Sequence, residues 1–172
     1  MAYYKEIVTK AVIGKGKKTT KEVQTINTTE NVNNVLGCWV INHSFSGVID
    51  NGTIIVNGSY DVNVWYSYDN NTKTNVMIRR FTYSDTMNVK IKENSKLTNT
   101  SEIIVRSLSQ PSVTDVSNNG SEITLNIEKQ MGVEVVGDTK VRVSVADDYD
   151  DYEEIIDDND IDVSDVTDDY LN

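Results

Sequence analysis

Apolar and polar residues alternate with a period of two along most of this 172-residue chain, and no segment shows the spacing of an amphipathic helix. The clearest alternation lies between residues 53 and 66. The even-numbered positions of this segment would lie on one face of a strand, and the odd-numbered positions, which are mostly polar, on the other. The even-numbered positions are Ile54, Val56, Gly58, Tyr60, Val62, Val64 and Tyr66. The pattern predicts a strand of an antiparallel sheet, with one face in the core and the other toward water.

Seven further segments show the same pattern, at residues 7–13, 35–43, 76–83, 103–108, 123–127, 133–136 and 141–145. Many short strands separated by turns are typical of a sandwich or a barrel. We therefore predict an all-β protein, with an antiparallel β-sandwich-like domain over residues 1–146. Residues 147–172 are predicted to form a disordered acidic tail.

Turn-forming residues separate the predicted strands. The Asn-Gly pairs at 51–52 and 119–120 tolerate the positive φ angles of tight hairpins. Residues 69–72 and 137–140 are expected to form longer reversals, and residues 27–34 to form one long polar loop. Gly58 lies inside the best predicted strand, so we interpret it as a bulge or as a close backbone approach.

Charge is distributed unevenly along the chain. The last 26 residues hold 13 Asp and Glu and no Lys or Arg, whereas the rest holds 16 Lys and Arg against 14 Asp and Glu. The formal net charge of −11 therefore belongs to the tail, and the body is nearly neutral. Repulsion between neighbouring carboxylates opposes compaction of the tail.

The tail also contains six apolar residues in two sets with the spacing i, i+3, i+7, namely Tyr149, Tyr152 and Ile156, and Val163, Val166 and Tyr170. One interpretation is a solvated acidic coil, because Asp, Val and Ile are mediocre helix formers. The other is a pair of segments that fold on a partner, with apolar anchors and with carboxylates that steer the encounter. The carboxylates around the first anchors are Asp147, Asp148, Asp150, Asp151, Glu153 and Glu154.

Cys38 and His43 are the only cysteine and the only histidine of the chain. They lie five residues apart on one predicted strand, and this odd offset places them on opposite faces. No thiol–imidazole pair for catalysis is therefore expected. One Cys and one His also cannot supply a structural zinc site. We predict no catalytic residue, no metal site and no cofactor.

Two short motifs resemble binding loops but lack the required residues. Residues 14–19, GKGKKT, do not have the spacing of a phosphate loop, and we interpret them as a solvated basic turn. Residues 158–169 begin with the alternating aspartates of a calcium loop. However, Val163 stands where that loop requires glycine, and Asp169 where it requires a bidentate glutamate.

Composition narrows the classes of partner. The acidic chain lacks the clustered Lys and Arg of nucleic-acid binding, so no nucleic acid is expected. No apolar run approaches the roughly 18 residues of a membrane span, so direct membrane insertion is not expected. The charged and aromatic start of the chain and its single cysteine favour synthesis in a reducing cytosol.

The body offers candidates for contacts between copies. Six lysines stand against two glutamates in the first 26 residues. We expect Lys15, Lys17 and Lys18 to meet the acidic tail of a neighbouring subunit, in a head-to-tail contact. Trp65 and Tyr68 are a second pair of self-assembly candidates, with ordinary packing as their alternative. Strand addition at an exposed sheet edge is another route.

Five collinear blocks form a distinctive set across the body. They are EIVTKAV at residues 6–12, LGCWVINH at 36–43, GSYDVNVWYSY at 58–68, NTKT at 71–74 and VVGDTKV at 135–141. Together they resemble the outer spore coat morphogenetic protein family, coat protein E. The acidic tail lies where that family carries one, and residues 92–122 match the family only loosely.

This resemblance implies a non-enzymatic scaffold of the mature spore coat, made in the mother-cell cytoplasm of an endospore-forming bacterium. It implies self-association around the forespore, docking on a basement-layer spore coat ATPase and recruitment of outer coat proteins, to which the acidic tail contributes. Family members can carry further cysteines where this chain has Glu22 and Val113, which leaves a Cys38–Cys38 bond as the one possible cross-link. The alternative is a stand-alone ligand- or carbohydrate-binding β-sandwich that uses Trp39 or Trp65 as a stacking platform.

Overall fold

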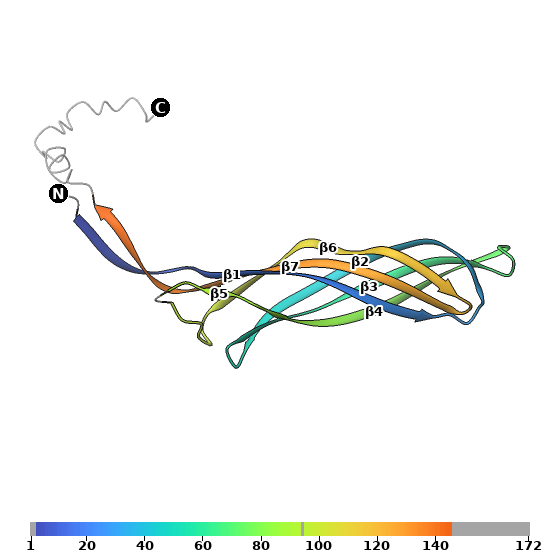
Figure 1. Ribbon diagram of the computed structural model, residues 1–172, viewed down its shortest axis with the longest axis horizontal. Helices are drawn as coiled ribbons and strands as arrows, with labels where there is room; N and C mark the ends of the chain where they lie inside the picture. Colours follow the sequence, from blue (N-terminus) through green and yellow to red (C-terminus); the bar gives the residue numbers. More distant parts are fainter. Residues whose placement is uncertain (1–2, 94, 146–172) are drawn as a thin grey trace, which may run out of the picture. The chain divides into compact units, whose positions relative to one another are not determined.

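The computed structural model describes residues 3–93 and 95–145, and all the regular elements in these residues are β-strands. They are β1 (Tyr3–Asn27), β2 (Val32–Asp50), β3 (Thr53–Tyr68), β4 (Lys73–Met87), β5 (Lys90–Ile91), β6 (Glu102–Asn119) and β7 (Glu122–Val145) (Figure 1). The β1–β5, β2–β3, β3–β4 and β6–β7 pairs all run antiparallel, which confirms the predicted all-β antiparallel class.

The chain divides into two compact units. The larger unit is Thr9–Thr139, and the described part of the smaller one combines residues 3–8 with residues 140–145. In the described part of the smaller unit, the guanidinium of Arg142 lies 5.2 Å from the ring centroid of Tyr4. The surfaces considered below all belong to the larger unit, and the predicted boundary between body and tail at residue 146 stays a prediction.

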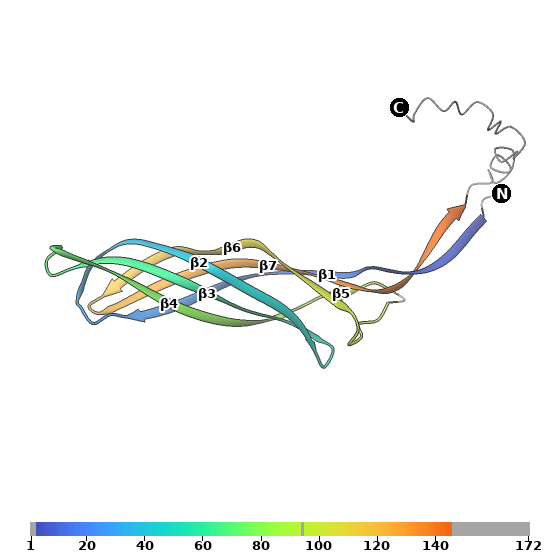
Figure 2. The ribbon, with the colours of Figure 1, turned by 180° about the vertical axis from the view of Figure 1, so that it is seen from behind.

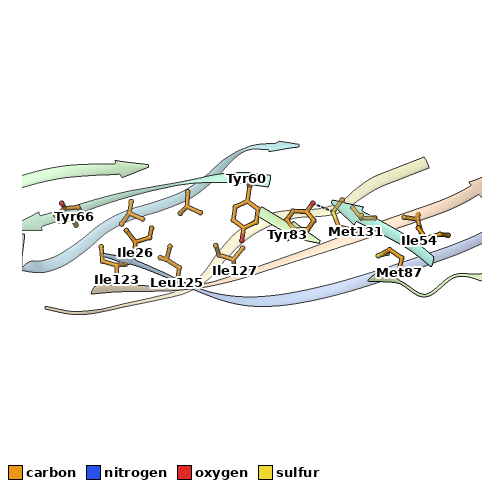
Figure 3. Close-up of a cluster of buried hydrophobic side chains, with 14 of the residues drawn as sticks. Ile26, Ile54, Tyr60, Tyr66, Tyr83, Met87, Ile123, Leu125, Ile127 and Met131 are labelled. Atoms are coloured by element: carbon orange, nitrogen blue, oxygen red, sulfur yellow. Dashed lines mark hydrogen bonds between the residues drawn. The ribbon is translucent and has the colours of Figure 1, made fainter. Parts of the chain in front are cut away.

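Two sheets build the larger unit. One has the strand order β5-β1-β7-β6 and the other the order β2-β3-β4. Their facing sides form the core, in which Tyr60 of β3 belongs to the same cluster as Leu125 and Ile127 of β7 (Figure 3). Along one side β2 lies close to β6, since a Cβ at Gly47 would lie 2.7 Å from Ile103 Cγ2 (Figure 2). The two sheets therefore pack face to face, as in a sandwich.

The alternation predicted for β3 is confirmed. All six large side chains assigned to its core face, from Ile54 to Tyr66, are buried. Gly58 interrupts this row because the ring of Tyr83 on β4 occupies the space, and a Cβ at Gly58 would lie 2.3 Å from Tyr83 Cζ. Pairing of β3 with both neighbours continues through Gly58 without a bulge. Gly58 thus marks a close approach, but the approaching group is an aromatic side chain, so neither the predicted bulge nor the predicted backbone approach is correct.

The predicted turns that rest on Asn and Gly are also confirmed. Asn51 and Gly52 have φ angles of 49° and 76°, and Gly120 has 59°. All three residues from Asp69 to Asn71 have positive φ, as the reversal after β3 requires. The connection between β1 and β2 covers only residues 28–31, so it is shorter than the predicted polar loop.

The turn predicted at residues 137–140 is wrong, because these residues continue β7. This strand joins the predicted strands 123–127, 133–136 and 141–145 into one element. Its inward positions keep one phase from Ile123 to Val135. The pattern in the sequence breaks at Lys129, a charged residue that nevertheless points into the interior.

The basic turn predicted at residues 14–19 is also wrong, because the segment lies within β1. Gly14 pairs with Ile91 of β5. A Cβ at Gly16 would lie 2.5 Å from the carbonyl oxygen of Asn88. The two glycines therefore make room for the chain around β5 and do not reverse the chain direction.

Lys129 brings a positive charge into the centre of the larger unit, with a side chain that is 1% exposed. Its Nζ donates hydrogen bonds to Thr20 Oγ1 at 2.7 Å and to Glu22 Oε1 at 3.2 Å. Asp85 Oδ2 lies 3.2 Å from the same nitrogen, and the ring centroid of Tyr83 lies 3.9 Å from it. One cation thus connects β7 and β1 of one sheet with β4 of the other.

The substitution Lys129→Met should lower the free energy of unfolding by about 3–5 kcal/mol, because Glu22 and Asp85 would keep their charges without a cation. Urea unfolding followed by circular dichroism measures this loss. Adding Glu22→Gln and Asp85→Asn should recover most of it, since no charge would then remain unpaired.

Lys73→Met is the matched control for this experiment. The ion pair of Lys73 with Asp69 spans 3.5 Å on the surface, so its loss should cost at most about 1 kcal/mol. Equal stabilities of Lys129→Met and Lys73→Met would contradict the proposed role of the buried cation.

Candidate interaction surfaces

The outward side of the β2-β3-β4 sheet carries large apolar side chains. Strand pairing brings Trp65 beside Val76, and the next rung brings Trp39 and Ile78 to either side of Asn63. Trp39 and Trp65 are each 43% exposed, Val76 is 50% exposed and Ile78 is 57% exposed. We define the outer apolar face as the set of five exposed residues Trp39, Ile41, Trp65, Val76 and Ile78.

Gly37 brings the two tryptophans of this face together. It pairs with Trp65 and precedes Trp39 by two positions, so the three residues share one side of the sheet. A Cβ at Gly37 would lie 3.4 Å from Trp39 Cζ3 and 4.0 Å from Trp65 Cε3. Both indoles therefore border the space above Gly37.

An ion pair between Asp61 and Arg80 lies next to the outer apolar face. Asp61 Oδ1 accepts a hydrogen bond from Arg80 Nε at 2.8 Å. Asp61 Oδ2 accepts one from Arg80 Nη2 at 3.2 Å and another from Asn42 Nδ2 at 3.0 Å. The hydrogen bonds from Arg80 and then from Asn42 lower the pKa of Asp61. The carboxylate is therefore compensated, and it does not oppose an apolar partner on the neighbouring residues.

Of the two aromatic candidates from the sequence, Trp65 contributes to this face and Tyr68 does not. Tyr68 is half-buried and packs against the core, with its ring centroid 6.2 Å from that of Tyr66. The alternative of ordinary packing thus describes the position of Tyr68. A role for Trp65 in self-assembly stays a prediction.

The three candidate lysines do not form one patch. Lys15 and Lys17 line a hollow of about 350 Å³ on the β5-β1-β7-β6 sheet, together with Arg106 and Leu108. Lys18 follows the opposite phase of β1, and its Nζ donates a hydrogen bond to the carbonyl oxygen of Thr86 at 3.3 Å. Only the first two lysines can therefore act at the same site.

The predicted tail sites lie outside the described residues. They comprise the anchors and carboxylates of residues 147–156, and the second set of anchors, Val163, Val166 and Tyr170. The calcium-like sequence at 158–169 lies outside them as well. Partner binding by the tail stays a prediction.

Cys38 and His43 lie on the same side of β2, so their predicted placement on opposite faces is wrong. The register of β2 against β3 shifts between Ile41 and Ser44, and Asn42 has a left-handed φ of 56°. This bulge inverts the alternation, and both side chains pack inward. About 16 Å of strand still separates the two residues, at 3.3 Å per residue, so they form no thiol–imidazole pair.

His43 is a half-buried hydrogen-bonding residue on the inward side of β2. Its Nδ1 lies 3.1 Å from Gln110 Oε1, and its Nε2 lies 2.6 Å from the hydroxyl oxygen of Tyr83. A neutral ring with its proton on Nδ1 satisfies both contacts, because it donates to the amide oxygen and accepts from the hydroxyl. Burial lowers the pKa of His43 and so favours this neutral form.

A model of the outer spore coat protein E (CotE) family matches residues 3–172. The chain belongs to this family. Its members are structural coat proteins, and membership implies a morphogenetic role in the spore coat. No curated protein and no solved structure matches the chain.

Two further findings on this CotE-family chain concern metal ligands and membrane spans, within the part of the chain that the structure describes. Across residues 3–93 and 95–145, no group of three or more His, Cys, Asp and Glu could hold a metal ion. Among the same residues, no helix is long and apolar enough to cross a membrane.

Sequence reasoning missed the β4 half of the outer apolar face, although a signal was present. Residues 38–41 and 76–78 are apolar at consecutive positions, which breaks the alternation of a strand with one wet face. Such runs indicate a second apolar face. Lys129 gave no comparable signal, because its partners Glu22 and Asp85 are distant in the sequence.

The Cys38 thiol should react about 100-fold more slowly than an exposed thiol at pH 8, because only its deprotonated form is reactive. Burial raises the pKa of Cys38 to about 11. The rate of reaction with an aromatic disulfide reagent measures this difference, and unfolding in urea should abolish it. For the same reason, we expect no disulfide dimer in non-reducing conditions.

An exposed cysteine provides the control, as Thr72→Cys in a Cys38→Ser background. Thr72 lies in the exposed reversal between β3 and β4. Equal native rates for Cys38 and for the cysteine at position 72 would show that Cys38 is accessible and would restore cross-linking of the assembly as an option.

Proposed function

We propose that this chain is a non-enzymatic morphogenetic scaffold that self-assembles around the forespore and recruits outer spore coat proteins. Membership of the CotE family supports a coat role. The observation that supports self-assembly best is the outer apolar face, because contiguous exposed apolar patches mark interaction surfaces on soluble proteins.

The composition of the outer apolar face fits a protein partner. It combines two tryptophans, from β2 and β3, with aliphatic side chains from β2 and β4. Tryptophan is enriched among the residues that dominate binding energy at interfaces. Asp61 and Arg80 neutralise each other at its border. A second copy of the chain presents the same uncharged face, so we propose that copies associate through it.

Recruitment is proposed to belong to the acidic tail. Its 13 carboxylates and its two sets of apolar anchors fit partners with basic surfaces and apolar pockets. On this proposal the partners are the outer coat proteins, and the body docks on the basement-layer coat ATPase. The chain is then made in the mother-cell cytoplasm and assembles on the forespore surface.

The second candidate function is carbohydrate binding by Trp39 and Trp65. The two indoles that border Gly37 favour it, since adjacent aromatic rings can stack on a flat ligand. Small-ligand sites are usually concave, however, whereas this surface follows the plane of a sheet. We therefore favour contact with another protein surface.

Removal of the outer apolar face should disrupt self-assembly. In 500 mM salt, Trp65→Ser/Ile78→Ser should raise the concentration for half-assembly at least tenfold, because each apolar contact is lost on both copies. Light scattering after size-exclusion chromatography measures this concentration, and circular dichroism checks the fold.

Val23→Ser/Ile104→Ser is the matched control, because these exposed side chains lie on β1 and β6 of the other sheet. It should assemble like the wild type. Unchanged assembly of Trp65→Ser/Ile78→Ser would contradict the proposed contact between outer apolar faces. A wild-type chain that stays monomeric but binds glycans would favour the second candidate function.

Deletion of residues 147–172 should separate recruitment from assembly. We expect the truncated chain to self-assemble in 500 mM salt, where charge contacts are screened within several Å. Spores that make it should lack most of their outer coat proteins, as quantified by mass spectrometry of coat extracts. Loss of salt-resistant assembly would show that the division of labour between body and tail is wrong.

A further inference from the structure

We infer that the hollow lined by Lys15, Lys17, Arg106 and Leu108 is a docking site for residues 147–154 of a second copy of the chain. The inference deepens the proposed self-assembly and rests on it. It adds a contact that is distinct from the outer apolar face, because the hollow lies on the other sheet.

The hollow exists because β7 lacks a side chain at its outward position 132. Gly132 pairs with Arg106 of β6, and Leu108 folds over the glycine, since a Cβ there would lie 2.9 Å from Leu108 Cδ1. On the other side, Gln130 donates a hydrogen bond to Thr19 Oγ1 at 3.2 Å, which ties β7 to β1. The result is an apolar floor between two strands that carry basic side chains.

The walls of the hollow are predominantly basic. Lys15, Lys17 and Arg106 line it, and Glu134 is the single carboxylate among the lining residues. Glu134 lies 4.0 Å from Arg106, so the acid and the arginine balance each other. Salt bridges between described residues include neither Lys15 nor Lys17. The positive charges of Lys15 and Lys17 can therefore attract an anionic ligand.

The occupant must bring carboxylates for the lysines and an apolar group for the floor. Residues 147–154 have the sequence DDYDDYEE, with six carboxylates and two tyrosines. A tyrosine ring can cover Leu108 and Gly132 and lie beside the cationic side chains. The carboxylates on either side of the ring can then pair with Lys15 and Lys17. This segment of a second copy satisfies both requirements, and the second set of anchors remains available for coat proteins.

The test uses full-length chains in 50 mM salt, in a Trp65→Ser/Ile78→Ser background that removes the outer apolar face. We expect concentration-dependent association of this background. Lys17→Glu should raise the half-association concentration at least tenfold, and so should Tyr149→Ser/Tyr152→Ser, which keeps every charge. Light scattering measures each value.

Lys21→Glu is the matched control. Lys21 is exposed on the same strand and in the same outward phase, four positions beyond Lys17, and the charge change is identical. It should shift association less than twofold. A mixture of the Lys17→Glu and Tyr149→Ser/Tyr152→Ser chains should form one-to-one dimers, because one chain supplies an intact tail and the other an intact hollow.

Two outcomes would overturn the inference alone. One is an equal effect of Lys17→Glu and Lys21→Glu, which would mean that only net charge matters. The other is a mixture of the two defective chains that stays monomeric. By contrast, a wild-type chain that never associates at any salt concentration would overturn the proposed self-assembly itself.

Discussion

The burial of the Lys129 charge is the constraint on which the rest of the larger unit depends. An ammonium group without access to water is tolerated only where opposite charges and acceptors surround it. Glu22 of β1 and Asp85 of β4 supply these charges from two different sheets. A slip of β7 by one residue would turn Lys129 outward and leave both carboxylates unpaired. The interior is therefore compatible with one register, and that register decides which residues each strand presents to solvent.

Two outward surfaces of different character follow from this register. The β2-β3-β4 sheet presents tryptophans and aliphatic residues beside a compensated ion pair. The β5-β1-β7-β6 sheet presents a hollow whose walls are basic and whose floor is apolar. Salt should affect contacts through these surfaces differently, because screening weakens charge pairs and leaves apolar burial largely intact. Measurements of association at low and at high ionic strength therefore distinguish the two contacts in solution.

Local chemistry made much of the fold predictable. The core face of β3 follows from strict alternation, and the Asn-Gly hairpins follow from backbone conformations that few residues adopt. Features that depend on distant partners were not predictable. The charge of Lys129 interrupts the apolar pattern of β7, and the residues that make its burial possible lie far away in the sequence. The bulge at Asn42 places Cys38 and His43 on the same face, although their spacing predicts opposite faces. For the candidate surfaces, Trp65 was predictable as an exposed aromatic, but its neighbours Val76 and Ile78 required the register of β4.

The two inferred contacts also differ in symmetry, and this difference bears on the assembly they would build. A contact between two outer apolar faces is isologous, so it closes after two copies. A contact between the hollow of one copy and the tail of another is heterologous, so a linked pair keeps one free tail on the first copy and one free hollow on the second, and further copies can add. Either contact alone would give a dimer or a chain of copies. Together they would link each dimer to further dimers through the hollow and the tail of every copy. Such an assembly can extend in more than one direction, which a continuous coat layer requires.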